Sequence, residues 1–276
     1  MPASLAVTLP HGIRVGSEWT RDARIRSLTG EEEEFLRGEG AGLRPVERTT
    51  ALLARCVESV GPAEPSALVA ELTVGDREAL LLQLRRLTFG DRLDAVVACP
   101  VTDCGERLDV ELSVAELLVE PYAEEGEWQE IRVESGGATR TGRFRAPTGA
   151  DQAAAAGLAP DLEEAARALI ERCVEGAGVD DALARVLPGL MAERDPQAEL
   201  MLSLDCPACG RGFRVLFDTG DYLQRELTAR GDELYEEVHQ LALHYHWSER
   251  EIMAMPTGKR RRYLELLAQT FEGTAA

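Results

Sequence analysis

Apolar and polar residues alternate in two separate stretches of the chain, which is the pattern of β-strands that bury one face. In each stretch the alternation adjoins a short segment that contains two cysteines. The pattern therefore predicts two β-hairpins about a hundred residues apart in the sequence. The alternating residues are Leu108, Val110, Leu112 and Val114 in the first stretch, and Leu200, Leu202, Leu204, Phe213, Val215 and Phe217 in the second.

Apolar residues at helical spacing predict helices at residues 49–60 and from Gly75 to about Gly90. Thr29 is expected to cap another helix, because the acidic residues 31–34 that follow it favour the positive end of a helix dipole. Short strands are expected at residues 5–15 and 23–28, with a turn at residues 10–12, and a linker is expected at residues 61–65.

Between the two hairpins, the pattern predicts an inserted segment with two strands and three helices. The C-terminal region is predicted to be entirely helical, with Ser248 and Thr257 as N-caps. The predicted strands span residues 127–134 and 140–146, with a turn at 135–137, and the predicted helices span residues 151–156, 162–175, 180–193, 222–230, 232–245, 249–255 and 259–271.

Four of the six cysteines lie at the predicted hairpin tips, in two Cys-Pro…Cys-Gly segments. Two residues separate Cys206 from Cys209 and four separate Cys99 from Cys104, and both spacings occur among zinc ligands. Because four thiolates complete a tetrahedral Zn²⁺ site, the sequence predicts one structural zinc held by all four. Four buried cysteines without a metal are the alternative. Disulfides are disfavoured, since no signal peptide directs the chain to an oxidising compartment.

The remaining candidate ligands have simpler explanations. Cys56 and Cys173 lie among apolar residues at helical spacing, so we expect them to be small core residues. His239, His244 and His246 are close in sequence, but His244 and His246 diverge by about 200° on a helix. We therefore expect no metal at these histidines.

These elements predict an α+β fold, in which a zinc-ribbon-like pair of β-hairpins accompanies an inserted α/β segment and an all-helical C-terminal bundle. The expected division has five segments. They are an N-terminal β-rich segment with a short helix at 1–47, helices plus the first cysteine hairpin at 48–118, inserted strands and helices at 119–198, the second cysteine hairpin at 199–218, and a helical C-terminal region at 219–276.

Charge and composition narrow the function. A formal net charge of −19 disfavours binding to duplex DNA or RNA, because the phosphates are repelled. One basic run, residues 259–262, could contact phosphate or an acidic partner, although a solvated helix face is the simpler expectation. No apolar run is long enough to span a bilayer, and the expected location is the cytoplasm. No catalytic motif stands out, so we do not expect an enzyme.

Several stretches in order carry a resemblance to a known family: residues 28–36, 74–82 leading to Cys99, 144–151, 237–252 and 260–264. Together they resemble the baseplate hub assembly chaperone family of contractile phage tails, which also occurs in phage-like extracellular contractile injection systems. The resemblance covers roughly residues 8–270 and rests on the ordered set rather than on one stretch. Cys206 and Cys209 match the zinc-ribbon-like pattern of that family, while Cys99 and Cys104 depart from it by two inserted residues.

The resemblance implies a non-catalytic cytoplasmic assembly factor whose partners are baseplate hub, spike or wedge proteins. It supplies no catalytic residues. Two alternatives stay open: a permanent structural component of the baseplate, and a zinc-ribbon adaptor that binds nucleic acid or a polymerase through the basic run. A zinc hydrolase ranks last, because four cysteine ligands leave no open position on the metal for water.

Overall fold

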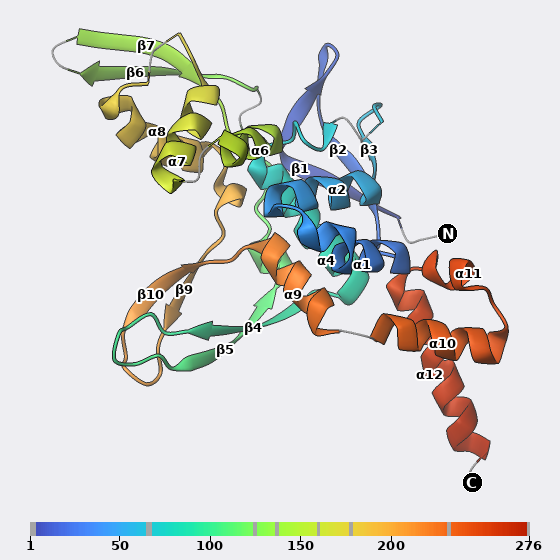
Figure 1. Ribbon diagram of the computed structural model, residues 1–276. Helices are drawn as coiled ribbons and strands as arrows, with labels where there is room; N and C mark the ends of the chain where they lie inside the picture. The colour runs from blue at the N-terminus through green and yellow to red at the C-terminus, as the bar shows by residue number, and fades with distance from the viewer. Residues whose placement is uncertain are drawn as a thin grey trace.

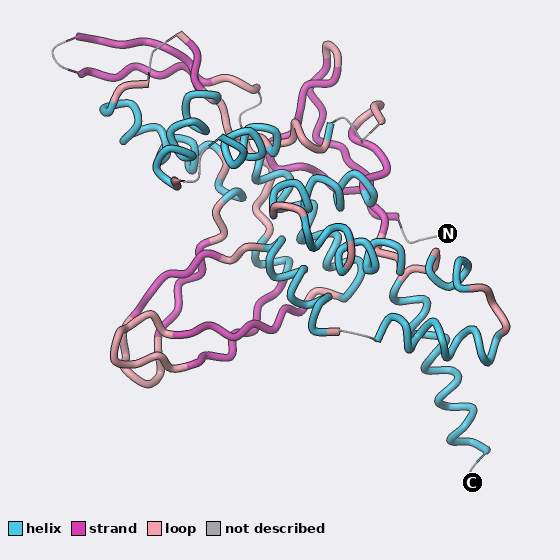
Figure 2. Tube along the Cα trace, in the orientation of Figure 1, coloured by secondary structure: helices cyan, strands magenta, loops and turns pink. Residues whose placement is uncertain are grey.

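The computed structural model describes residues 4–64, 68–123, 126–135, 138–158, 161–176, 179–230 and 233–274. It confirms the mixed α+β fold, with small antiparallel sheets and helices at the C-terminal end (Figures 1 and 2). Among these residues, no helix is long and apolar enough to cross a membrane. The division into five segments stays a prediction.

The N-terminal sheet has the order β1-β2-β3, with β1 at Ser4–Val15, β2 at Glu18–Arg26 and β3 at Val57–Val60. The turn expected at residues 10–12 is wrong: β1 continues through them as an irregularity in its pairing with β2. Gly12 has a φ of +87°, which glycine adopts without steric cost, so the backbone bends here without reversing. The chain reverses after Val15 instead.

Two predicted helices end early because a strand follows them. Helix α2 spans Pro45–Cys56, and the last residues of the predicted helix at 49–60 form β3 against β2. Helix α7 spans Leu162–Arg172, and its predicted continuation contains β8 at Val174–Glu175, which pairs with β7. In both cases a neighbouring strand forms the backbone hydrogen bonds, and the spacing of apolar residues within the segment does not reveal that neighbour.

The main core surrounds helix α4, Val74–Phe89, whose N-cap is Thr73. Helices α1 (Gly30–Arg37), α2 and α9 (Thr219–Ala229) pack with it beside the N-terminal sheet. The predicted cap at Thr29 is confirmed, because its backbone N–H donates to the Glu32 carboxylate at 3.0 Å. Fully buried members of this core include Leu9, Leu28, Leu53, Cys56, Val60, Leu72, Leu80 and Leu84.

The two predicted hairpins form separate two-stranded sheets. The inserted segment between them has its own sheet, β6-β7-β8, and its own core, in which Cys173 is fully buried. The predicted linker residue 65 and turn residues 136–137 lie outside the described residues. The remaining elements up to α9 are η1 (Glu39–Gly42), β4 (Arg92–Ala98), β5 (Arg107–Ser113), α5 (Val114–Leu117), β6 (Gln129–Ser135), β7 (Ala138–Phe144), α6 (Gly149–Leu158), α8 (Asp181–Arg194), η2 (Pro196–Ala198), β9 (Met201–Asp205) and β10 (Gly212–Leu216).

The C-terminal helices are α10 (Glu233–Tyr245), α11 (Glu249–Met253) and α12 (Thr257–Thr274), whose last turns extend away from the rest of the chain (Figure 1). Ser248 caps α11 as predicted, because its hydroxyl accepts the N–H of Glu251 at 3.3 Å. Thr257 was expected as an N-cap but is the first residue of α12 itself. Its hydroxyl hydrogen-bonds to the Glu33 carboxylate of α1 instead.

The basic run at residues 259–262 is not simply a solvated helix face. Arg260 is fully buried and pairs with Glu33 at 2.8 Å and with Glu237 at 2.9 Å. Arg261 lies 4.0 Å from Glu237, and only Lys259 and Arg262 are exposed. Arg260 and Arg261 therefore join α12 to α1 and α10. The sequence pattern had suggested that Arg260 faces solvent.

We expect Arg260→Ala to destabilise the protein by about 3–5 kcal/mol, because it leaves two carboxylates buried without their counter-charge. Urea unfolding measures the change. The matched control is Arg262→Ala, which removes an exposed pair with Glu265 and should change stability by less than about 1 kcal/mol. Equal effects of the two substitutions would contradict this assignment.

Candidate metal centre

The two cysteine hairpins share a base in the core. Leu93 and Val114 from the first hairpin pack with Leu200 and Phe217 from the second, against Leu82 of α4. The Tyr222 hydroxyl also donates to the Asp94 carbonyl at 3.1 Å, which ties α9 to β4. From this common base the hairpins run outward and meet again at their tips (Figure 1).

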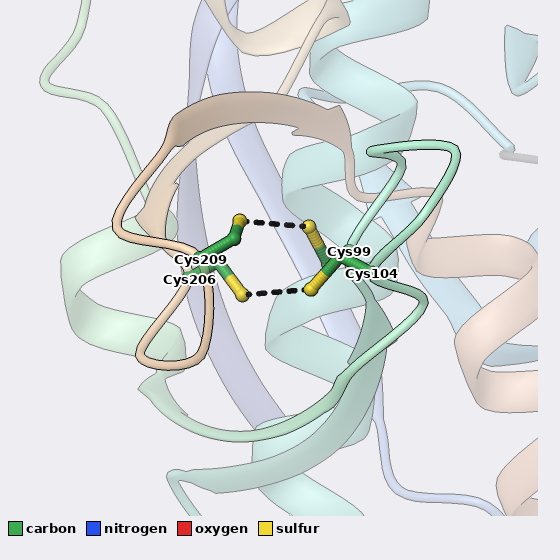
Figure 3. Close-up of side chains that lie close together, drawn as sticks. All are labelled: Cys99, Cys104, Cys206 and Cys209. Atoms are coloured by element: carbon green, nitrogen blue, oxygen red, sulfur yellow. Dashed lines mark hydrogen bonds between the residues drawn. The ribbon is translucent and has the colours of Figure 1, made fainter.

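The tips bring the four predicted cysteines into one cluster (Figure 3). Cys99 Sγ lies 3.9 Å from Cys209 Sγ, and Cys104 Sγ lies 3.6 Å from Cys206 Sγ. All four sulfur atoms lie within 4.8 Å of one another. A tetrahedron with Zn–S bonds of about 2.3 Å has sulfur–sulfur edges of about 3.8 Å, so the spacing fits one zinc ion with small adjustments.

Each tip is shaped by the same backbone devices despite the different cysteine spacing. The Cys99 N–H donates to Glu106 O at 2.7 Å, and the Cys206 N–H donates to Arg211 O at 3.0 Å. The glycine after each second cysteine has a positive φ, +59° at Gly105 and +70° at Gly210. Glycine adopts this conformation without the cost that a side chain adds, so the two tips turn alike.

Two thiols of the cluster have pKa values shifted in opposite directions. Backbone N–H groups of Cys209 and Ala208 lower the pKa of Cys206 to about 7. A hydrogen bond at Val101 lowers the pKa of Cys99, but burial and the three neighbouring thiols outweigh it and raise the pKa to about 12. Since like charges in one site oppose each other, a divalent cation is what would allow all four sulfurs to be thiolates.

Comparison with known proteins identifies the family. The sequence matches the family described as "T4 bacteriophage base plate protein" over residues 17–184. The chain belongs to this baseplate family. No curated protein and no solved structure matches the chain. The matched region contains Cys99 and Cys104 and ends before Cys206, so the second half of the cluster lies beyond it.

For this baseplate protein, the structure brings together the residues that the sequence predicted as a site, and metal binding by them stays a prediction. Cys56 and Cys173 lie outside the cluster, and burial raises the pKa of both thiols. The three histidines do not join any group of potential metal ligands among the described residues. His244 packs on the Phe271 ring instead, with centroids 5.0 Å apart.

Sequence analysis missed one buried polar cluster, formed around Asp76 and Asp195. An aspartate beside a helix end is ordinarily exposed, so neither residue stood out as a candidate. Their burial depends on chain segments more than a hundred residues apart, and no local pattern in the sequence signals it.

We expect Cys206→Ser to abolish stoichiometric zinc binding and to lower the melting temperature. The substitution removes one of four sulfur ligands, and a structural zinc contributes on the order of 10 kcal/mol to folding. Metal analysis and thermal unfolding measure the two effects. Cys56→Ala is the matched control, because it removes a buried thiol outside the cluster and should keep one zinc per chain. Full zinc content in Cys206→Ser would contradict the site.

We expect a zinc chelator to increase amide hydrogen exchange at β4, β5, β9 and β10 and to leave the core of the inserted segment protected. The hairpins are otherwise joined through their base, whereas Ile131, Phe144 and Leu187 pack in a separate core. Mass spectrometry of peptides from both regions provides the measurement. Unchanged exchange at the hairpin tips after metal removal would show that zinc does not hold them together.

Proposed function

We propose that this protein is a non-catalytic assembly factor, or chaperone, for the baseplate hub of a contractile tail or contractile injection system, and that it carries one structural zinc. Membership of the baseplate family over residues 17–184 is the observation that carries the proposal. The narrower role in hub assembly rests on the resemblance of the ordered stretches between residues 28 and 264. A cytoplasmic location follows from the same proposal, since tails assemble where their proteins are made.

The cysteine cluster supports a structural metal rather than a catalytic one. Four sulfur donors from Cys99, Cys104, Cys206 and Cys209 fill a tetrahedral coordination sphere and leave no position for water or substrate. The ion would stabilise the meeting of two hairpins that have separate backbone pairing. Four sulfur ligands in a tetrahedron also suit iron, so metal analysis of the purified protein decides between the two metals.

The proposed partners are other baseplate proteins, namely hub, spike or wedge subunits. An excess of 19 negative charges favours partners with a basic surface, because long-range attraction speeds encounter and like charge suppresses wrong pairing. Binding that depends on such exposed charges weakens as the salt concentration rises.

The nucleic-acid adaptor is the weaker alternative. It needs the basic run at residues 259–262 to face phosphate, but Arg260 is buried between Glu33 and Glu237. Arg262 also pairs with Glu265 at 2.8 Å on the same helix. Phosphate binding would have to break these contacts within a strongly acidic molecule, and their loss would offset the gain from counterion release.

The experiment is an affinity purification of the tagged full-length chain from its native lysate during tail assembly, followed by mass spectrometry and by quantification of the chain in finished particles. We expect hub, spike or wedge proteins in the purified fraction and little of this chain in particles. Retention at a fixed stoichiometry in particles would favour a permanent baseplate component. Recovery of polymerase or ribosomal proteins without tail proteins would overturn the assembly role.

A further inference from the structure

Two carboxylates are buried where the inserted segment joins the core. Asp76 is 0% exposed in the first turn of α4, and Asp195 is 1% exposed just after α8. Asp195 Oδ2 accepts the N–H of Gly75 at 2.8 Å, so the second carboxylate sits on the N-terminal turn of the helix that contains the first. A Cβ on Gly75 would collide with the Asp195 carboxylate, so only glycine permits this approach.

The Asp195 carboxylate also fastens both ends of the inserted segment. Its Oδ1 accepts the hydroxyl of Tyr122 at 2.7 Å, and the Tyr122 hydroxyl in turn accepts the N–H of Gln197 at 3.1 Å. The Gln197 side chain accepts the N–H of Val119 at 2.8 Å and donates to Leu117 O at 3.1 Å. The chain therefore leaves and rejoins the core at one hydrogen-bonded point.

Asp76 connects the same point to the N-terminal sheet. Its two carboxylate oxygens accept the backbone N–H groups of His11 and Gly12, at 2.8 and 2.9 Å. These residues form the irregular part of β1, which explains why the strand bends there without reversing. Three parts of the molecule, the sheet, α4 and the inserted segment, thus meet at two acidic side chains.

The charged and titratable groups around this point do not form a simple ion pair. Burial and the charge of Asp195 raise the pKa of Asp76 to about 7, against a smaller lowering by the charge of Arg21. Arg21 donates to the carbonyls of His11 and Tyr122 at 3.2 and 2.7 Å. Burial also raises the pKa of Asp195 and of Tyr122, so the tyrosine stays a neutral donor.

His11 lies beside the two carboxylates, and its pKa is shifted in the opposite direction to theirs. Burial lowers its pKa, while the nearby charge of Arg194 also lowers it and that of Asp195 raises it. Its Nδ1 lies 2.9 Å from Gly12 O, which places the proton of the neutral ring on Nδ1. His11 Nε2 is buried without a hydrogen-bond partner among the described residues.

We propose that Asp76 and Asp195, with His11 and Tyr122, form a proton-controlled joint between the core and the inserted segment. When the carboxyl pair holds a proton, the pair carries one negative charge, and the backbone N–H groups of His11, Gly12 and Gly75 are enough to keep it buried. When the proton leaves, two adjacent buried negative charges repel each other, and opening of the joint returns them to water.

The difference in pKa between the closed and the open joint determines how closure depends on pH. Asp76 binds its proton more tightly in the closed joint than in an open one, where its pKa returns to about 3.9. Its contribution to closure is therefore complete below about pH 4 and is lost as the pH rises to about 7. His11 contributes the reverse, because its lowered pKa favours opening as the pH falls below about 6.5.

Amide hydrogen exchange of the full-length protein, corrected for the intrinsic dependence of exchange on pH, tests the joint. The comparison is between the natural protein and Asp76→Asn from pH 5 to 8, in peptides from residues 117–123 and 194–200. The opening constant of the natural protein divided by that of Asp76→Asn should rise about tenfold per pH unit up to about pH 7 and then level off. His11 is present in both proteins, so its contribution cancels in this ratio.

Asp181→Asn is the matched control, because Asp181 lies in the inserted segment with an 82% exposed side chain, and its ratio should not change with pH. A ratio for Asp76→Asn that is constant with pH would overturn the joint. If Asp76→Asn does not fold, carboxyl carbon NMR of the natural protein decides. An aspartate that titrates near pH 7 supports the joint, and the absence of any aspartate that titrates well above 3.9 overturns it.

Discussion

The burial of helix α4 on nearly every side is the constraint on which the other elements depend. Buried residues, polar as well as apolar, lie on every face of α4, and the helix contacts the N-terminal sheet, α2, α9 and α12. Its two buried arginines form hydrogen bonds and an ion pair with neighbouring segments. Arg77 donates to Val69 O at 2.8 Å and to the Thr50 hydroxyl at 2.9 Å, and Arg85 pairs with Glu226 at 2.9 Å. The helix thereby fixes α2 and α9 by hydrogen bonds as well as by apolar packing.

The candidate metal centre is a distant consequence of the same helix. Leu82 of α4 contacts the base of both cysteine hairpins, and Arg85 also donates to the Gly90 carbonyl at the start of the first one. The two hairpins have a common packed base and matching glycine turns, and their tips meet at one point. Four sulfur atoms from chain segments about a hundred residues apart can then approach within 4.8 Å. A metal held there by four sulfur atoms would have a structural role, which agrees with a protein of a baseplate family.

The spacing of apolar and polar residues predicted most helices and strands. It failed where a segment distant in the sequence supplies the pairing strand or the opposite charge. The hairpins, the caps at Thr29 and Ser248, and the helix before Gly90 follow from residues within one or two turns of each other. The residues after Cys56 and after Arg172 were predicted as helix, but they form strands because β2 and β7 lie beside them. The run of basic residues at 259–262 was predicted to face solvent. Acidic residues of α1 and α10, distant in sequence, bury Arg260 instead.

The sequence by itself determined the chemistry of the candidate metal centre, because cysteine type, spacing and the following glycine are local properties of the two hairpin tips. It also determined the fold class, since alternation and helical spacing are read within short windows. Only the tertiary structure decided which charges lie inside. Whether Asp76, Asp195 or Arg260 is buried depends on which segments fold over it, and the free energy of a charge depends on that surrounding more than on its neighbours in sequence. The joint at Asp76 and Asp195 therefore emerged from the packing of the chain and from no motif in it.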